Sequence, residues 1–399
     1  MHRKTEKKNI RLYYIRYILY YFANTFVSGG LIQSFMLEGG ITSSQVSVYT
    51  AVIQIVQAAA MLILGPVLER KKEIIKINAD ANYLILPLCV GMLIVSVVPG
   101  MSVGIKYAII LSTSIIAYIS YSIIGIIEYK LPYLIIDMEN YGHVLLTAGF
   151  CIGLTSMSAT TLFSFFIRRF DYFKTAAVFI FIGIIMYVAS TVVGKRYVVI
   201  NPHDNDKHEE NRTGESIFKY GPFKKLFVPN FLRGFASGTF ALLTTVGYYY
   251  GIVDSKSASL MVVISNIVIM GGCIIYAKIS KHKIDGLLTL ISAVMLCVLM
   301  PLMLVGKNTV LFIVMYAAGV FFKNIIDYSC PVICASIVDY EHAGEFSSWR
   351  IALYMLGAAV SGFVTIPMLE IFGGLLTMII NGVIFIIMGV YYWSVSRHK

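Results

Sequence analysis

Charged side chains lie inside or at the ends of several long apolar segments of this chain. Lys323 and Asp327 are four residues apart, so on a helix they share one face and can form an ion pair. Arg233 and Glu128 lie in two other apolar segments. A charge in such a segment is unfavourable unless it has a partner or a function. These residue types allow ion-pair exchange between helices, or the binding and release of a proton.

Glu128 and Asp327 occupy the same position in a pattern that the chain contains twice. Each copy ends an apolar segment with an acid, a Tyr and a Pro, and continues with Asp-x-Glu-x-x-Gly. The copies are Ile126-Ile127-Glu128-Tyr129-x-x-Pro132 with Asp137-x-Glu139-x-x-Gly142, and Ile325-Ile326-Asp327-Tyr328-x-x-Pro331 with Asp339-x-Glu341-x-x-Gly344. Residues 22–26 and 43–56 have counterparts at 235–240 and 255–268. Matched regions in the same order in both halves predict two homologous helical bundles.

The composition requires a membrane around these segments. Hydrophobic residues make up 58% of the 399 residues, and charged residues only 13%. A soluble domain of this length could not bury so much apolar surface. In lipid, only helices and closed barrels satisfy the backbone, and the apolar runs are continuous over about 20 residues instead of alternating. The chain is therefore predicted to be an all-α membrane protein.

The apolar runs predict twelve membrane spans. They cover residues 12–36, 44–67, 79–98, 104–127, 145–167, 175–193, 227–250, 257–277, 286–305, 309–328, 348–369 and 372–395. An even number places both termini on one side, and most of the 32 Lys and Arg residues fall on that side. By the positive-inside rule, both termini of this multi-pass cell-membrane protein are predicted to be cytoplasmic. Basic cytoplasmic loops beside anionic lipid then account for the net charge of +11, and no nucleic-acid partner is expected.

The one long polar stretch divides the chain into two sets of six spans. We expect an N-terminal six-helix bundle at residues 1–194, a cytoplasmic central loop at 195–226 and a C-terminal six-helix bundle at 227–399. Two pairs of small residues, Gly149 with Gly153 and Gly357 with Ser361, predict close contacts between helices.

This organisation resembles the major facilitator superfamily over nearly the whole chain. Residues 65–72, with Glu69 and Arg70, resemble the family's basic loop motif between spans two and three, although the family usually has Asp where this chain has Glu69. The doubled loops are similar to those of the glycoside–pentoside–hexuronide:cation symporter branch. The resemblance implies two six-helix bundles related by a pseudo-two-fold axis along the membrane normal.

The charged residues of the doubled loops and of the nearby helix ends predict a gate on the cytoplasmic side. Ion pairs between the two halves would hold this side closed and would break as the bundles move. Glu128 and Asp327 are also the best candidates for proton coupling. The alternative, that these charges only anchor helix ends, stays open. The predicted gating or coupling residues are Arg70, Glu128, Asp137, Arg233, Lys323, Asp327, Asp339 and Arg350.

Polar side chains within the spans are the candidates for substrate binding. Amides, hydroxyls and phenols suit hydroxyl-rich or zwitterionic solutes, because they bind through hydrogen bonds without a fixed charge. Hydrogen bonding between helices is the alternative role for each of them. The candidates are Asn24, Gln33, Gln54, Gln57, Thr239, Thr244, Tyr248 and Asn266.

The leading function is secondary transport of a small polar solute by alternating access, with a sugar or glycoside as the first candidate. A proton or sodium gradient, or the solute's own gradient, would drive it. The alternatives are an exporter or flippase of an amphipathic compound, and a non-transporting membrane sensor on the same fold. No enzyme activity or cofactor is expected. No metal site is expected either, because Cys330 and Cys334 have no further ligand nearby in the sequence. The expected partners are the solute, the coupling ion and the lipid bilayer, and a monomer is the expected state.

Overall fold

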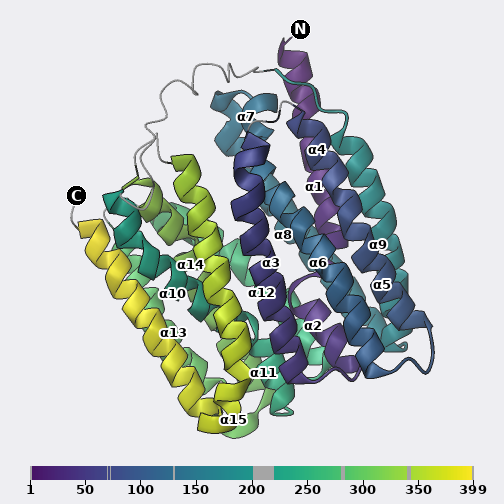
Figure 1. The fold of residues 1–399 in the computed structure, drawn as a ribbon, viewed down its shortest axis with the longest axis vertical. Helices are drawn as coiled ribbons and strands as arrows, with labels where there is room; N and C mark the ends of the chain where they lie inside the picture. The colour runs from purple at the N-terminus through teal and green to yellow at the C-terminus, as the bar shows by residue number, and fades with distance from the viewer. Residues whose placement is uncertain are drawn as a thin grey trace. The chain divides into compact units, whose positions relative to one another are not determined.

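The computed structural model describes residues 2–69, 71, 73–128, 131–200, 220–279, 284–338 and 343–397. Every regular element in these ranges is a helix, as Figure 1 shows. In each helix the backbone N–H and C=O groups bond within the same segment, which is what a lipid environment requires. The predicted all-α fold is therefore confirmed.

The chain divides into two compact units. The first contains residues 1–32 and 59–213, and the second contains residues 33–58 and 214–399. Residues 33–58, which the sequence assigns to the N-terminal bundle, thus pack with the C-terminal helices. The division into bundles of residues 1–194 and 227–399 stays a prediction.

The first unit contains seven α-helices that lie wholly or almost wholly within it, and one short 3-10 helix. These are α1 (His2–Val27), α4 (Ile74–Ala81), η1 (Asn82–Ile85), α5 (Leu86–Val97), α6 (Val103–Glu128), α7 (Leu131–Ile135), α8 (Met138–Ile167) and α9 (Tyr172–Gly194). Helices α4, η1 and α5 follow one another without a break and together form the third predicted span.

The helices α2 (Gly29–Glu38) and α3 (Ser43–Glu69) pass from one unit to the other. The remaining helices belong to the second unit. They are α10 (Gly221–Ala241), α11 (Leu243–Tyr249), α12 (Ser255–Ile279), α13 (Asp285–Leu302), η4 (Val305–Lys307), α14 (Thr309–Ala335) and α15 (Ala343–Arg397).

Several predicted spans contain a break. Helices α1 and α2 meet at Gly29, whose positive φ of 57° ends the first helix. Helices α10 and α11 are bent by 43° and together make the seventh span. Gly373, with φ 75° and ψ 164°, separates the last two spans inside α15. Among the described residues, nine helices are long and apolar enough to cross a membrane, or ten with the bent pair counted as one.

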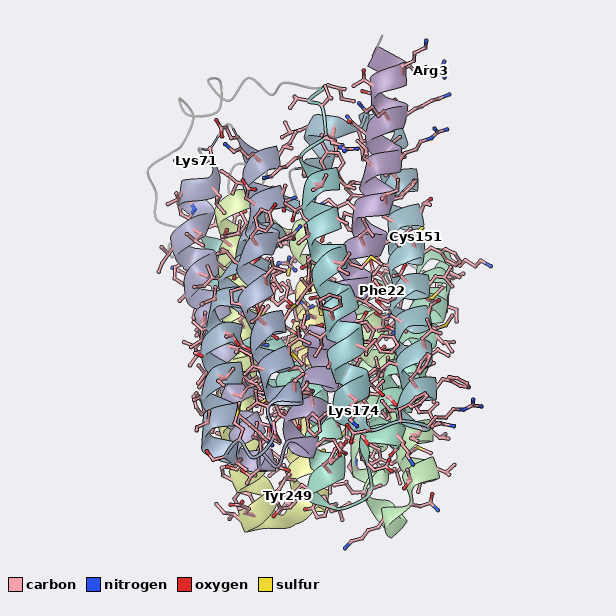
Figure 2. All side chains as sticks on the ribbon, turned by 90° about the vertical axis from the view of Figure 1, so that its right-hand side faces the viewer. Arg3, Phe22, Lys71, Cys151, Lys174 and Tyr249 are labelled. Atoms are coloured by element: carbon pink, nitrogen blue, oxygen red, sulfur yellow. The ribbon has the colours of Figure 1, made fainter. Side chains whose placement is uncertain are left out.

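The first helix begins earlier than its sequence predicts. Helix α1 starts at His2, whereas the predicted span starts at residue 12. Figure 2 shows Arg3 and Phe22 on this one helix. Its basic start is attached to the rest of the first unit, because Asn9 donates to the carbonyls of Ile135 (3.0 Å) and Val198 (2.7 Å). Glu6 accepts a hydrogen bond from the Asp137 N–H.

The second copy of the repeated pattern remains helical beyond the predicted end of its span. The prediction ends this span at residue 328, but α14 continues through Pro331 to Ala335. A proline inside a helix has no N–H for the carbonyl four residues earlier, which here belongs to Asp327. In the first copy α6 ends at Glu128, and a separate short helix α7 begins at Leu131.

Small residues allow α10 and α15 to approach closely. A side-chain carbon added at Gly357 would lie 2.7 Å from the backbone nitrogen of Phe235, and one added at Gly238 would lie 3.0 Å from Cβ of Ser361. The predicted close contact at Gly357 and Ser361 is therefore confirmed. At Gly149, by contrast, an added carbon would meet no described atom within 4 Å, so the close contact predicted there is wrong.

We expect Gly357→Ala to destabilise the protein by about 1–3 kcal/mol, because the new methyl group forces two helix backbones apart. Thermal unfolding of the detergent-purified protein measures this effect. Gly149→Ala is the matched control, and it should be neutral or slightly stabilising because its methyl group has open space in a helix. Equal melting temperatures for the two variants would contradict the packing of α10 against α15.

Candidate functional site

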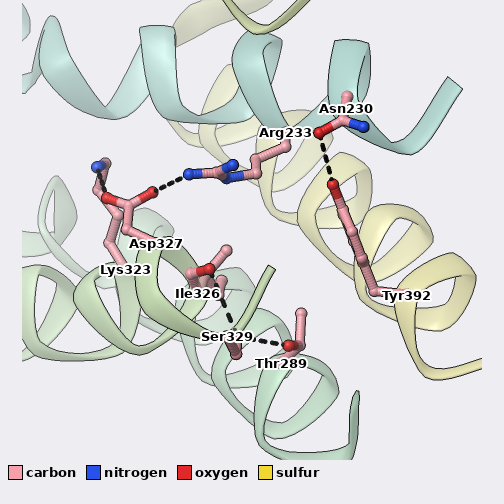
Figure 3. A network of polar contacts seen from close by, with 8 residues as sticks. All are labelled: Asn230, Arg233, Thr289, Lys323, Ile326, Asp327, Ser329 and Tyr392. Atoms are coloured by element: carbon pink, nitrogen blue, oxygen red, sulfur yellow. Dashed lines mark hydrogen bonds and ion pairs between the residues drawn. The ribbon is translucent and has the colours of Figure 1, made fainter. Parts of the chain in front are cut away.

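Three charged side chains of the second unit form one connected cluster, the Arg233–Asp327–Lys323 triad. Arg233 Nη2 donates to Asp327 Oδ1 at 3.1 Å, and Lys323 Nζ donates to Asp327 Oδ2 at 2.5 Å (Figure 3). Lys323 and Asp327 pair along α14, as their spacing predicts. Arg233 reaches the same carboxylate from α10. One acid therefore holds two cations that come from different helices.

Aromatic and helical packing surrounds the triad but leaves it partly accessible. The guanidinium carbon of Arg233 lies 4.9 Å from the ring centroid of Tyr354 on α15, within the range of a cation–π interaction. The side chains of Arg233, Lys323 and Asp327 are 10%, 21% and 28% exposed, respectively. The carboxylate and the ammonium are thus partly exposed, whereas the guanidinium is nearly enclosed.

Two neutral hydrogen-bonded pairs lie beside the triad and connect further helices (Figure 3). Tyr392 of α15 donates to Asn230 Oδ1 of α10 at 2.9 Å. The hydroxyls of Thr289 on α13 and Ser329 on α14 lie 2.6 Å apart. Because buried polar groups need partners, these bonds fix how the four helices pack around the charges.

The first unit contains a comparable pairing that the sequence analysis missed. Glu128, the last residue of α6, interacts electrostatically with Arg16 and with Tyr17 of α1. Arg16 is only 2% exposed, and its guanidinium carbon lies 5.9 Å from the ring centroid of Tyr197. Arg16 is not among the predicted gating or coupling residues, although its position inside the first predicted span was the available signal.

Tyr197, the aromatic neighbour of Arg16, follows α9 and lies outside the predicted spans. Burial raises the pKa of its phenol to about 12, although the positive charge of Arg16 acts in the opposite direction. The phenol therefore stays neutral across the physiological pH range.

Tyrosines line one side of α1 next to Arg16. The hydroxyls of Tyr13 and Tyr17 lie 3.0 Å apart, and the ring centroids of Tyr17 and Tyr21 are 5.8 Å apart. Spacings of four residues place these three rings on one helix face. Further along the same helix, Asn24 Oδ1 accepts a hydrogen bond from Tyr187 at 3.2 Å. The predicted substrate residue Asn24 is thus bonded to another helix.

Gln33 and Thr239 have a bonding role between helices. Gln33 donates to the Ala241 carbonyl at 3.3 Å and accepts from Thr245 at 3.1 Å. The Thr239 hydroxyl lies 2.9 Å from that of Ser361. For both residues the contacts correspond to the alternative that the sequence left open.

Gln54 is different from the other candidates in the second unit. Its amide oxygen is buried and has no hydrogen-bond partner among the described residues. A buried acceptor without a partner is unfavourable by about 1–3 kcal/mol, so it is a natural position for a ligand or a water molecule. Gln57 and Asn266 are half-buried, and Thr244 is buried. Tyr248 lies 3.0 Å from the Ser34 hydroxyl and donates to Glu38 at 3.4 Å.

The remaining predicted gating residues are less informative. Arg70 and Asp339 lie outside the described residues. Asp137 is the N-cap residue of α8, and Arg350 is half-buried at the start of α15. Both partners of Asp327 in the described structure belong to its own unit, so the exchange of ion pairs between the two halves stays a prediction. Within the described ranges, no group of three or more His, Cys, Asp or Glu side chains could hold a metal ion.

Solved transporter structures match nearly the whole chain. The D-xylose–proton symporter matches 99% of this chain and 99% of its own, with a TM-score of 0.72 at 12% identity. The fold is that of major facilitator transporters. The nucleoside transporter NupG matches 99% of this chain and 100% of its own, with a TM-score of 0.68 at 12% identity. The human organic anion transporter MFSD10 matches 97% and 99%, with a TM-score of 0.68 at 10% identity.

The likeness to these proteins concerns the major facilitator fold alone. No protein-family model matches the chain, and no curated protein matches it in sequence. The resemblance to the glycoside–pentoside–hexuronide:cation symporter branch stays a prediction.

We expect Arg16→Met to destabilise the protein by about 3 kcal/mol, because it leaves the Glu128 carboxylate without its cation in an apolar surrounding. Thermal unfolding in detergent measures the loss. Arg11→Met is the matched control, since Arg11 lies on the same helix but is exposed. Adding Glu128→Gln to Arg16→Met should recover part of the stability. The pairing is wrong if Arg16→Met is as stable as Arg11→Met.

Proposed function

We propose that the protein is a secondary transporter that moves a small polar solute by alternating access. The observation that carries this proposal is the Arg233–Asp327–Lys323 triad, a partly accessible group of charges within apolar helices of the major facilitator fold. Such charges are unfavourable in a membrane and are typical of solute and ion pathways.

The polar residues of the second unit support a solute with hydrogen-bonding groups. Gln54 has a buried amide oxygen without a partner among the described residues, and Gln57 lies three positions further along α3. Residues three apart share a helix face, so both amides can be presented to one solute. Among the matched structures, one is named for D-xylose and one for nucleosides, and both of these solutes are rich in hydroxyl groups.

Hydrogen bonds inside the second unit support alternating access. Residues 33–58 are attached to the C-terminal helices through Gln33 with Thr245, Ser34 with Tyr248, and Ser47 with the Gly362 carbonyl. By the predicted topology, these bonds lie at the ends of the spans that face away from the cytoplasm. We infer that they form a closed outer gate, which must open when the solute enters or leaves on that side.

Thermal unfolding of the purified protein with a panel of sugars, glycosides, nucleosides and amphipathic cations tests the solute class. A solute at about 100 times its dissociation constant should stabilise the protein by roughly 2.7 kcal/mol. The stabilising solute is then tested for uptake into proteoliposomes at varied pH and sodium concentration. Stabilisation only by amphipathic compounds favours the exporter or flippase, and folded protein that neither binds nor transports any solute contradicts the proposal.

Gln54→Ala should change substrate affinity, whereas Gln33→Ala should change stability. We expect Gln54→Ala to raise the KM for the transported solute roughly fivefold, the equivalent of one hydrogen bond, while stability is kept. Gln33→Ala should lower the melting temperature with little change in KM, because the Gln33 amide already bonds one backbone carbonyl, that of Ala241, and one side chain, that of Thr245. Uptake kinetics and thermal unfolding of both variants separate these roles. An unchanged KM for Gln54→Ala would exclude it as a substrate residue.

A disulfide across the inferred gate should stop transport. A side-chain carbon built at Gly362 lies 2.9 Å from Cβ of Ala51, close enough for a disulfide after a small shift. We expect Ala51→Cys with Gly362→Cys, in a background that lacks the native cysteines, to lose uptake after oxidation and regain it after reduction. Each single cysteine variant is the control. Undiminished uptake by the fully cross-linked protein would exclude this contact as a gate.

A further inference from the structure

The triad has an excess of positive charge. Arg233 and Lys323 contribute two positive charges, and Asp327 contributes one negative charge. Both oxygens of Asp327 are already engaged, Oδ1 by the guanidinium and Oδ2 by the ammonium. Among the described residues, a net charge of one is therefore left inside apolar helices, where an uncompensated charge is unfavourable.

In the described structure, Arg233 and Lys323 both form their ion pair with Asp327. Asp327 is the carboxylate that acts most strongly on both Arg233 and Lys323. Asp254 bonds to Ser257 at the start of α12, and Asp285 accepts from Tyr276. Glu38 accepts from Tyr248, and Glu370 is exposed on α15.

The two cations also have unused hydrogen-bond donors. An ammonium group has three N–H donors and a guanidinium has five. In the described structure, Lys323 makes one hydrogen bond to Asp327, and Arg233 donates to Asp327 through Nη2. Arg233 Nε is buried without a partner among the described residues, although Arg233 as a whole is only 8% exposed. The cations are thus held in place, while most of their donors have no partner among the described residues.

These donors suit a single oxyanion. Arg and Lys side chains bind carboxylates through short, charge-assisted hydrogen bonds. The excess charge of one matches a monoanion better than a dianion, because a dianion would leave a new uncompensated negative charge. The exposure of Lys323 and Asp327 gives a solute access to the ammonium side of the triad.

We propose that Arg233 and Lys323 form a recognition site for the carboxylate of a monoanionic organic solute, with Asp327 holding the two cations in position. This proposal rests on the proposed transport function and names its substrate class. The bound carboxylate completes the charge balance of the triad. The uncharged amides of Gln54 and Gln57 would contact the remaining, neutral part of the solute.

Matched pairs of an acid and its amide test the proposal on the purified full-length protein. Glucuronate with glucuronamide, and benzoate with benzamide, are nearly identical in shape and differ in one negative charge. We expect at least one acid to bind at least tenfold more tightly than its amide, as measured by calorimetry and thermal unfolding. Equal affinity within every pair overturns the proposal. Equally tight binding of chloride, sulfate or phosphate also overturns it, since the site would then accept any small anion.

Substitutions in the triad should change acid binding in opposite directions. Lys323→Met leaves a neutral Arg233–Asp327 pair, so the preference for the acid over the amide should fall about tenfold or disappear. Asp327→Asn leaves two cations, so the affinity for the acid should rise. A residue that only supports the fold would weaken acid and amide alike in both variants. Lys256→Met, at an exposed position of the same unit, is the control and should leave the preference unchanged.

Two further measurements keep the outcomes distinct. If Asp327→Asn does not fold, the double variant with Lys323→Met has Arg233 without a charged acid and so regains a net charge of +1. It should bind the acid more tightly than Lys323→Met alone, whose net charge is zero. Uptake assays separate this proposal from the transport function. Selective acid binding without any uptake would contradict transport and leave the anion site intact. Uptake of a neutral solute by a protein that binds no acid would contradict the anion site and leave transport intact.

Discussion

The high free energy of a charge among apolar helices is the constraint on which the organisation of both units depends. Each unit places a buried arginine of its first long helix beside an acid at or near the end of a later helix. The pairs are Arg16 with Glu128, and Arg233 with Asp327. Because either partner alone would be strongly destabilising, each pair also determines which helix faces must meet. The repeated sequence pattern therefore supplies, in each unit, the acid that the buried arginine needs as a partner.

The two units satisfy this requirement differently. In the first unit, one arginine interacts with one acid, and a row of tyrosines surrounds them. In the second unit, Lys323 adds a second cation to the same carboxylate. Among the described residues, the first arrangement is balanced in charge, whereas the second has a positive excess and donors without a partner.

Polar side chains in the spans divide into two groups by their contacts. Gln33 and Thr239 bond to neighbouring helices and so contribute to packing, and Gln54 keeps a buried acceptor without a described partner. The close approach of α10 and α15 at Gly357 supports the Arg233–Asp327–Lys323 triad, because it brings Tyr354 against the guanidinium of Arg233. Packing of small residues thus positions a charged group several turns away from any loop.

The sequence alone determined the features that depend on neighbouring residues. Continuous apolar runs predict the helices, and the spacing of Lys323 and Asp327 predicts their ion pair, because both depend on the geometry of one helix. The tertiary structure alone decided that Arg233 joins this pair, that Arg16 is buried, and that Gln33 and Gln54 have different roles. These contacts join residues of separate helices, and helix packing sets such distances through many weak contacts that no local pattern records.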